Sequence, residues 1–321
     1  SVAPMMERTD RHCRYLLRLI SPNSWLYTEM ITASALVDGG RLDLLRFHPS
    51  EFPVALQLGG CDSEKLAQAA YLGAKAGYNE INLNVGCPSS RVQSGRFGAS
   101  LMAEPTMVAS CIKAMTQAVD IPVTVKTRLG IDDFDSYTFL HDFIGTVADA
   151  GCRTVIIHAR KALLAGLSPK QNREIPPLNY QRVYRLKKNY SSLEIILNGG
   201  LDTEAKIFKE LEHVDGVMLG RQAYKNPYLL SSLDSKLFGG PITSSRENIL
   251  RAFLLYVRAE LEIGTPLNVM IRPLLGLYAG CPGSRAWRCF LGKLPRGEKG
   301  YELLQEYQPA LPNPPPCPQL G

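Results

Sequence analysis

The chain of 321 residues lacks the features of a membrane-spanning or secreted protein. It contains no run of eighteen or more apolar residues, which excludes a transmembrane helix. Its first residues, Ser1-Val2-Ala3-Pro4, include neither an initiator methionine nor the basic and apolar regions of a signal peptide. We therefore predict a cytoplasmic protein with no membrane partner, and a numbering that begins inside a longer gene product.

Metal-ligand spacing is lacking as well. The eight cysteines form no C-x-x-C pair and no zinc-ligand pattern. The closest two, Cys281 and Cys289, have no histidine nearby, so we reject a metal site there. We predict no bound metal, and reduced thiols as expected of a cytosolic protein.

The first predicted strand is not followed by the glycine motif G-x-G-x-x-G, which disfavours a doubly wound nucleotide-binding sheet. Instead, short apolar runs rich in β-branched residues recur, and each leads into Gly, Pro or Asn and then a helical pattern. Eight such runs occur, at residues 1–3, 25–28, 53–58, 80–85, 122–127, 154–158, 194–197 and 216–219. Eight β/α units over about 230 residues fit a TIM (β/α)8 barrel, which usually takes roughly 250 residues. The doubly wound sheet is the alternative fold.

Helices are predicted between these strands from capping signals and periodicity. They span residues 9–20, 62–76, 105–119, 135–151, 179–190 and 203–212, with Asp62 as a cap and Gly77 as a stop. From about Pro241 the strand signals end, and residues 247–263 and 269–278 have helical periodicity. The predicted α/β fold is a barrel domain over residues 1–240, a small all-α domain over 241–307 and a Pro-rich disordered tail over 308–321.

The net charge of +6 is unevenly distributed along the chain. Residues 160–188 hold eight Lys or Arg against one acid, Glu174, and residues 246–299 hold nine Lys or Arg against four Glu. Concentrated positive charge is typical of a protein that binds a polyanion. Solvated helix faces would give the same pattern, so charge alone leaves both interpretations open.

Polar or Gly-rich sequence follows most of the predicted strands, at the carboxyl ends where barrel enzymes place their catalytic groups. Gly199-Gly200 follows the seventh strand, and Gly220-Arg221 follows the eighth. Loops at these two positions form phosphate sites in such barrels, because glycine lets backbone N–H groups approach the oxygens. We predict a phosphorylated cofactor or substrate there; ordinary turn glycines are the alternative.

Side chains at other strand ends are suited to redox chemistry. Lys126 on the fifth strand could stabilise negative charge on a reduced flavin ring, and Gln57 on the third could hydrogen-bond the polar edge of that ring. A salt-bridged lysine inside the barrel is the alternative for Lys126. His158 ends the sixth strand two residues before Arg160, which favours a ligand role over that of a core histidine.

Cys87 lies in a Gly-Cys-Pro turn directly after the fourth strand. A cysteine thiol has an ordinary pKa of about 8.5, so it is largely protonated at neutral pH and can act as a general acid. Four other cysteines lie in helical or helix-flanking patterns and are predicted to be structural, namely Cys13, Cys61, Cys111 and Cys152. The loop position of Cys87 favours a catalytic role.

These strand ends resemble those of the tRNA-dihydrouridine synthases. The resemblance covers residues 1–239 and rests on the motifs Ala3-Pro4-Met5, Thr9-Asp10-Arg11, Tyr27-Thr28-Glu29-Met30, Gln57-Leu58-Gly59-Gly60, Glu80-Ile81-Asn82-Leu83-Asn84-Val85-Gly86-Cys87-Pro88, Lys126-Thr127-Arg128, His158-Ala159-Arg160, Asn198-Gly199-Gly200 and Gly220-Arg221. Residues 168–178 resemble the A subgroup of bacterial synthases, which acts on D-loop uridines near positions 20 and 20a of tRNA. Residues 292–300 and the Pro-rich tail depart from the family pattern.

The resemblance implies an FMN-bound barrel, a C-terminal helical domain that grips tRNA, NADPH as the reductant and a monomeric enzyme. It implies that FMN is held by Pro4, Met5, Met6, Gln57, Lys126, His158, Asn198, Gly199, Gly200, Gly220 and Arg221. Asn84 would contact the target uridine or the flavin, and Lys170 and Arg173 would touch the tRNA. The flavin would deliver a hydride to C6 of uridine, and Cys87 would protonate C5.

Two other functions fit parts of this pattern. An FMN barrel oxidoreductase that acts on a small molecule, such as dihydroorotate or an enone, would share the phosphate loops and Lys126. The basic segments and the helical appendage favour tRNA over that alternative, because a small substrate needs neither. A non-enzymatic RNA-binding module is the remaining class, and it would need no flavin site.

Overall fold

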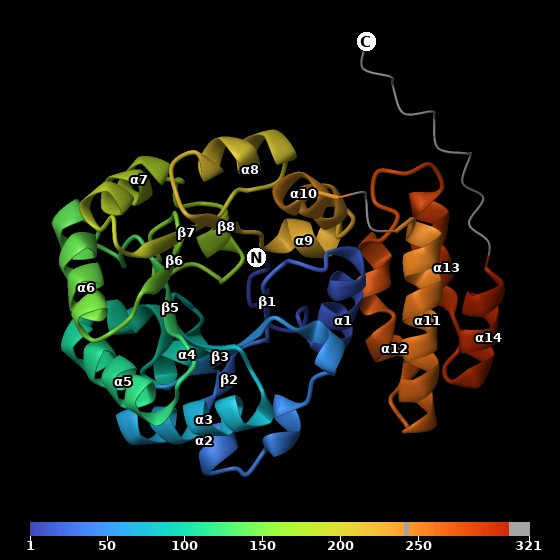
Figure 1. Ribbon diagram of the computed structural model, residues 1–321, viewed down its shortest axis with the longest axis horizontal. Helices are drawn as coiled ribbons and strands as arrows, with labels where there is room; N and C mark the ends of the chain where they lie inside the picture. The colour runs from blue at the N-terminus through green and yellow to red at the C-terminus, as the bar shows by residue number, and fades with distance from the viewer. Residues whose placement is uncertain (241–243, 308–321) are drawn as a thin grey trace. The chain divides into compact units, whose positions relative to one another are not determined.

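The computed structural model describes residues 1–240 and 244–307 of the chain (Figure 1). They form two compact units. The first consists of Ser1–Arg14 and Ser24–Gly220, and the second of Tyr15–Asn23 and the described residues from Arg221 on. The units divide after Gly220, whereas the predicted domain boundary follows residue 240. The predicted disordered tail, 308–321, lies outside the described residues.

The first unit is built on a parallel sheet. Its main path runs in the order β1 (Leu26–Tyr27), β3 (Val54–Gly59), β4 (Glu80–Val85), β5 (Val123–Arg128), β6 (Thr154–His158), β7 (Glu194–Asn198) and β8 (Gly216–Met218). Short β2 (Ile31–Thr32), which the sequence did not predict, pairs with the end of β3. Val2 forms bridges both to Leu26 and to Leu219, so it connects the two ends of the path. The predicted TIM barrel is confirmed, with the first of its eight strands reduced to this one bridging residue.

Apolar side chains pack in part of the barrel interior. Ala3, Tyr27, Ala55, Ile156 and Met218 form one buried cluster, against which Trp25 and Ile196 pack. Most residues of β3 to β7 are buried, as expected of parallel strands that are covered on both faces. The interior is therefore a packed core rather than a channel, and barrels of this kind bind their ligands at the carboxyl ends of the strands.

Helices surround this sheet (Figure 1). They are α2 (Ala33–Val37), α3 (Ser63–Ala76), α4 (Ser90–Ser94), α5 (Pro105–Ala118), α6 (Tyr137–Asp149), α7 (Tyr180–Asn189) and α8 (Glu204–Leu211), with shorter 3-10 turns at Leu42–Leu45, Pro49–Glu51, Gly98–Ala103 and Gln171–Arg173. The predicted cap of α3 is confirmed, because Asp62 accepts hydrogen bonds from the backbone of Glu64 and Lys65. Gly77 ends α3 in the left-handed conformation, with a φ of 100°.

The second unit is helical. Its elements are most of α1 (Arg11–Ile20), then α9 (Arg221–Lys225), α10 (Leu229–Phe238), α11 (Arg246–Glu262), α12 (Leu267–Met270), a 3-10 turn at Arg272–Gly276, α13 (Ser284–Lys293) and α14 (Glu298–Glu306). Asp234 of α10 accepts hydrogen bonds from Ser21 and Asn23, and Tyr15 stacks on Tyr256 of α11 at a centroid distance of 3.9 Å. These contacts explain why the end of α1 groups with residues far along the chain.

One predicted helix of this unit is wrong. Residues 269–278 form the end of α12 and a 3-10 turn instead of one continuous helix. Pro273 lies in that turn, and proline has no backbone N–H with which to continue an α-helical hydrogen-bond ladder. The indole of buried Trp287 on α13 donates to the carbonyl of Leu274 at 2.7 Å, which stabilises the turn.

Candidate active site

The carboxyl ends of the parallel strands bring most of the predicted site residues to one edge of the barrel. The register pairs Asn84 of β4 with Lys126 of β5. It also pairs His158 of β6 with Arg128 of β5 on one side and with Asn198 of β7 on the other. This edge, hereafter the barrel mouth, is where barrel enzymes place their reacting groups.

The turn that carries Cys87 is held by Asn84. The Asn84 Oδ1 atom accepts hydrogen bonds from the backbone N–H groups of Gly86 at 3.1 Å and Cys87 at 3.0 Å. The Asn84 Nδ2 atom donates to Gln57 Oε1 at 2.9 Å. Because backbone N–H groups can only donate, they fix which end of the Asn84 amide faces the turn.

The hydrogen bonds continue from Gln57 down the barrel to a buried acid. Gln57 Nε2 donates to Asn82 Oδ1 at 2.8 Å, and Asn82 Nδ2 donates to Thr124 Oγ1 at 2.8 Å. The Thr124 hydroxyl then donates to Glu80 Oε1 at 2.5 Å. Glu80, Asn82 and Asn84 alternate along β4, so their side chains share one face of the strand.

Burial changes the acidity of the carboxyl group at the lower end of this chain. Removal from water raises the pKa of Glu80 to about 7, although the hydroxyls of Thr124 and Tyr27 both donate to it. The Glu80 side chain therefore changes charge near neutral pH. The side-chain amides of Gln57, Asn82 and Asn84 each accept a hydrogen bond from one neighbour and donate one to the next. All donors along this chain therefore point the same way, from the Cys87 turn toward Glu80.

Cationic side chains lie on β5, the strand next to β4 at the mouth. Lys126 Nζ donates to Asn198 Oδ1 at 3.1 Å, and Asn198 Nδ2 in turn donates to the carbonyl of Met218 at 2.7 Å. Burial first, and then the nearby Arg128 guanidinium, lower the pKa of Lys126 to about 7. Burial likewise lowers the pKa of Arg128 to about 10.

His158 lies within this positive environment. Its pKa is well below the ordinary value because of burial first, and then because of Arg128 and Lys126. The His158 Nδ1 atom is buried and has no hydrogen-bond partner among the described residues. Cations grouped in this way disfavour one another's charge, so a bound anion would stabilise them.

The two glycine loops differ in shape. Gly199 and Gly200 both have positive φ, 110° and 72°, and a Cβ on Gly200 would lie 2.5 Å from Leu178 Cδ1. Only glycine fits there without moving its neighbours. A Cβ on Gly220 would meet no described atom within 4 Å, which leaves open space beside its backbone.

The remaining predicted cofactor residues lie at the two ends of the barrel sequence. The backbone N–H of Met5 donates to Thr9 Oγ1 at 2.9 Å, which fixes the loop that follows Val2. Pro4 is partly buried in that loop, and the Met6 side chain is 57% exposed. Arg221 begins α9 and belongs to the second unit.

Residues 159–179, hereafter the basic loop, connect β6 to α7 and carry the predicted tRNA-binding residues. Lys170 is exposed and Arg173 is partly buried. Asn172 between them is fully buried; its side chain bonds the backbone of Leu163 in both directions, at 2.7 and 2.8 Å, and reaches the carbonyl of Leu167. The loop therefore has its own internal frame, from which Lys170 projects.

Known proteins match this chain over most of its length. A family model described as dihydrouridine synthase (Dus) matches residues 1–310. The chain belongs to the dihydrouridine synthase family.

Individual relatives agree with this membership. The tRNA-dihydrouridine(20/20a) synthase of Shewanella oneidensis is 55% identical over 294 residues, which cover 91% of this chain and 88% of that protein. The protein of the same name from Vibrio vulnificus is 52% identical over 316 residues, which cover 97% and 96% of the two chains. Among solved structures, morphinone reductase shares the barrel fold, with a TM-score of 0.52 at 11% identity over 74% of this chain and 85% of that chain.

Three residues of the site in this dihydrouridine synthase had no predicted role of their own. Glu80, Asn82 and Arg128 occur only within the motifs that carry the resemblance. The missed signal is the period of two along a strand: Asn82 shares a face with Asn84, and Arg128 with Lys126. Thr124 follows the same period and shares a face of β5 with Lys126, but its bond to Glu80 depends on the pairing of β4 with β5.

Two other features, a membrane-spanning helix and a metal-binding group, are absent from the described residues of this family member. Among residues 1–240 and 244–307, no helix is both long and apolar enough to cross a membrane. The same described residues contain no group of three or more His, Cys, Asp or Glu that could hold a metal ion.

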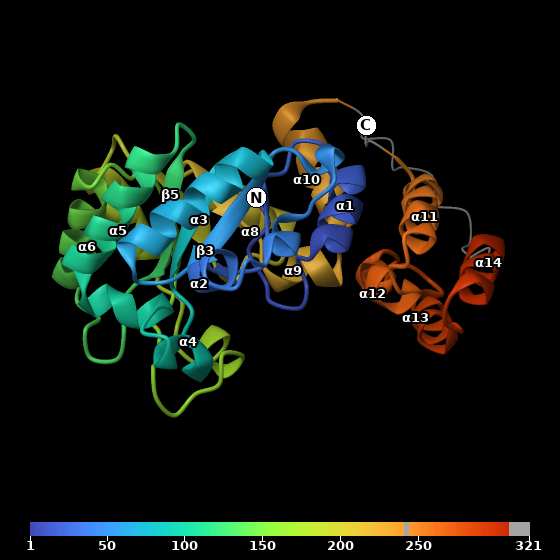
Figure 2. The same cartoon turned by 90° about the horizontal axis from the view of Figure 1, so that it is seen from below.

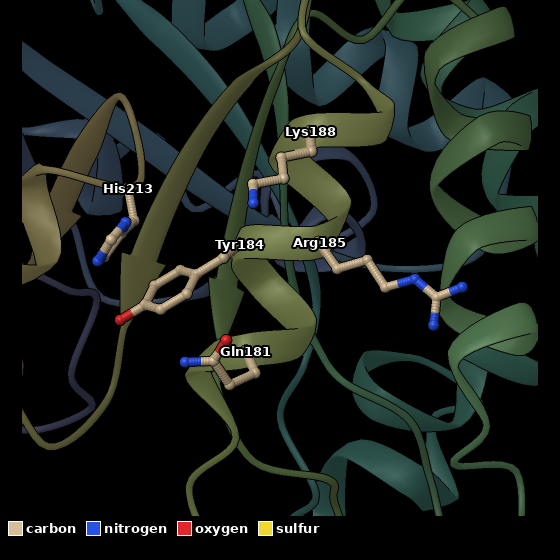
Figure 3. Close-up of a pocket in the computed structure, with 5 residues that line it drawn as sticks. All are labelled: Gln181, Tyr184, Arg185, Lys188 and His213. Carbon is tan, nitrogen blue, oxygen red and sulfur yellow. The ribbon is translucent and has the colours of Figure 1, made fainter.

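A pocket lies away from the mouth, along α7 (Figure 3). It is lined by Gln181, Tyr184, Arg185, Lys188 and His213. Its polar groups are largely engaged with protein: the Tyr184 hydroxyl donates to Glu210, and Arg185 lies 3.8 Å from the centre of the Tyr137 ring. We assign no ligand to this pocket.

The raised pKa of Glu80 predicts a pH-dependent contribution to stability. Because the folded-state pKa exceeds the ordinary value of 4.5, the contribution is fully present below pH 4.5 and is lost as pH rises through about 7. This difference between the two pKa values corresponds to about 3 kcal/mol in the free energy of unfolding. Glu80→Gln keeps the group neutral, so the free energy of unfolding of the wild type should fall relative to that of the variant between pH 5 and pH 8.

Urea unfolding of both proteins across this pH range measures the effect. Glu64→Gln, at an exposed position in the first turn of α3, is the matched control and should show no such trend. A difference between wild type and Glu80→Gln that stays constant from pH 5 to pH 8 would contradict the prediction.

Proposed function

We propose that this chain reduces D-loop uridines near positions 20 and 20a of tRNA to 5,6-dihydrouridine, with FMN as its bound cofactor and NADPH as the reductant. The observation that carries the proposal is the hydrogen-bonded Cys87 turn at a barrel mouth that also holds the side chains of Lys126, Arg128 and His158. Membership of the dihydrouridine synthase family and the printed names of its relatives support this choice of substrate.

The residues at the mouth fit a flavin mononucleotide. FMN carries a phosphate, and its pyrimidine side gains negative charge on reduction, so it needs cations and donors at both places. Lys126 and His158 supply buried nitrogen atoms, and His158 Nδ1 lacks a protein partner in the described chain. The open space beside Gly220 leaves room for phosphate oxygens near backbone N–H groups.

We assign cofactor binding to the residues expected from the sequence. These are Pro4, Met5, Met6, Gln57, Lys126, His158, Asn198, Gly199, Gly200, Gly220 and Arg221. Gln57 already spends one amide hydrogen on Asn82 and one acceptor site on Asn84, which leaves a second hydrogen and a second lone pair for the flavin edge. Its orientation is therefore set before the cofactor binds.

When bound, the flavin supplies the hydride that is added to C6 of the uracil ring. Cys87 gives its thiol proton to C5, so that one hydride and one proton together saturate the C5–C6 bond. The resulting thiolate recovers its proton from solvent. Asn84 fixes the turn through the Cys87 backbone and also touches Gln57, so it holds the proton donor and the cofactor edge in one frame.

The substrate base must leave its stack to reach the mouth, which costs a few kcal/mol. Binding energy from phosphate contacts can offset this cost. Lys170 is exposed on the basic loop, and partly buried Arg173 directly follows buried Asn172 in the sequence. We propose that both contact tRNA phosphates. A monomeric state and a cytoplasmic location remain predictions.

Replacement of Cys87 tests the chemistry. Cys87→Ala should bind FMN and oxidise NADPH as the wild type does, because neither step needs the thiol proton. Dihydrouridine formation should fall by about 10²-fold to 10⁴-fold, the usual contribution of a positioned general acid. Single-turnover reoxidation of the reduced enzyme by tRNA, with mass spectrometry of the product, measures this loss.

Cys61→Ala is the matched control, because Cys61 is also partly buried but follows β3 rather than β4. It should react at the wild-type rate. Normal dihydrouridine formation by Cys87→Ala would rule out the proton-donor role.

Salt dependence tests the tRNA contacts. Lys170→Ala and Arg173→Ala should each weaken tRNA binding and reduce the slope of log Kd against log salt concentration by about one. Fluorescence anisotropy with labelled tRNA at several salt concentrations measures both quantities. Lys75→Ala removes an exposed cation in the last turn of α3, outside both basic segments, and should leave the slope unchanged. Slopes that are identical in all three variants and the wild type would remove Lys170 and Arg173 from the interface.

A further inference from the structure

The turn that carries Cys87 is bonded on both sides by side chains from outside it. The carbonyl of Gly86, just before Cys87, accepts a hydrogen bond from Arg128 Nε at 3.1 Å. The carbonyl of Pro88, just after Cys87, accepts one from Gln93 Nε2 at 2.9 Å. The Cys87 carbonyl itself accepts from the backbone N–H of Ala99 at 2.9 Å. The main chain around the thiol is thus fixed at three successive carbonyls.

The same two side chains also reach the basic loop. Arg128 Nη1 donates to the carbonyl of Asn172 at 2.9 Å and to that of Lys161 at 3.3 Å. Gln93 Nε2 donates its other hydrogen to the carbonyl of Leu164 at 2.8 Å. Figure 2 shows α4, which carries Gln93, beside the yellow-green loop that precedes α7. Arg128 and Gln93 are therefore two braces that join the Cys87 turn to the loop that carries Lys170.

The braces leave little freedom between the two segments. Arg128 is only 5% exposed and Asn172 is fully buried, so a carbonyl or guanidinium that lost its partner there would not find water as a replacement. Gln93 has two amide hydrogens, and the carbonyls of Pro88 and Leu164 take one each. A shift of the basic loop must therefore either move the Cys87 turn or break these bonds.

We propose that Gln93 and Arg128 are positioning residues that couple the seating of tRNA on the basic loop to the placement of the Cys87 thiol. The inference rests on the proposed function. Phosphate contacts at Lys170 and Arg173 would fix the loop, and the braces would transmit that constraint to the main chain on both sides of Cys87. The flavin and its reduction by NADPH do not use the Gln93 brace.

Gln93→Met tests the coupling, because methionine keeps the side-chain length but donates no hydrogen bond. Gln93 is preferred to Arg128 for this purpose, since Arg128 also affects the charge of Lys126. The matched control is Gln171→Met, on the basic loop itself, where the glutamine side chain bonds only Ser168 of the same loop in the described contacts. A second variant, Asn172→Ala, removes the internal frame of the loop and leaves α4 intact.

Stopped-flow spectroscopy of the flavin enzyme separates the two half-reactions, and anisotropy gives the Kd for tRNA. Gln93→Met and Asn172→Ala should both slow reoxidation by tRNA by about tenfold to a hundredfold, the effect of a misplacement of about 1 Å. Reduction by NADPH should stay within about twofold, and the Kd for tRNA should change less than the rate does. Gln171→Met should match the wild type.

The possible outcomes separate this inference from the proposed function. If the wild type forms no dihydrouridine in tRNA, the proposed function fails. If the wild type forms it and Gln93→Met reacts as fast, the brace is dispensable and the inference is overturned. An equal loss in both half-reactions would reveal a merely structural role and would also overturn it. So would a slow Gln93→Met beside a fast Asn172→Ala, because the loop would then not be coupled to the turn.

Discussion

The hydrogen bonds of Asn84 are the constraint on which the rest of the site depends. Its carbonyl oxygen is claimed by the backbone of the Cys87 turn, so its amide nitrogen must face Gln57. That choice sets the orientation of Gln57 and, through Asn82, of every polar group down to Glu80. One backbone turn thereby determines how the barrel presents donors and acceptors to a ligand at its mouth.

On β5 and β6, the properties of the mouth residues depend on charge rather than on hydrogen-bond direction. Burial and mutual repulsion lower the pKa values of Lys126, Arg128 and His158, and all three would gain from an anion. The neutral amide chain and the cationic group stand on neighbouring strands because the register pairs Asn84 with Lys126. A redox cofactor that gains negative charge, and a base that gains a proton, need these two environments side by side.

Much of the fold could be predicted, because parallel strands and capped helices leave local signals such as Asp62 and Gly77. The exceptions depend on contacts between distant residues. The first strand is a single bridging residue, Val2, because the length of a strand depends on its two neighbours in the sheet. Residues 269–278 do not form one continuous helix, because Pro273 lies among them. In the site, strand ends predicted that Gln57, Lys126 and His158 lie at the carboxyl edge of the barrel, but not which side chains they contact. The braces could not be predicted, because they end on main-chain carbonyls, which no sequence pattern distinguishes.

That same property has a consequence for how this protein can change during evolution. Arg128 and Gln93 hold the loop by backbone oxygens, which every amino acid carries, so the frame does not depend on which side chains project from Lys161 or Leu164. Substitutions on the outer surface of the loop can alter its RNA contacts without removing the hydrogen bonds that join the loop to the Cys87 turn. The side chains of the loop can thus vary, while the position of its main chain stays tied to that turn.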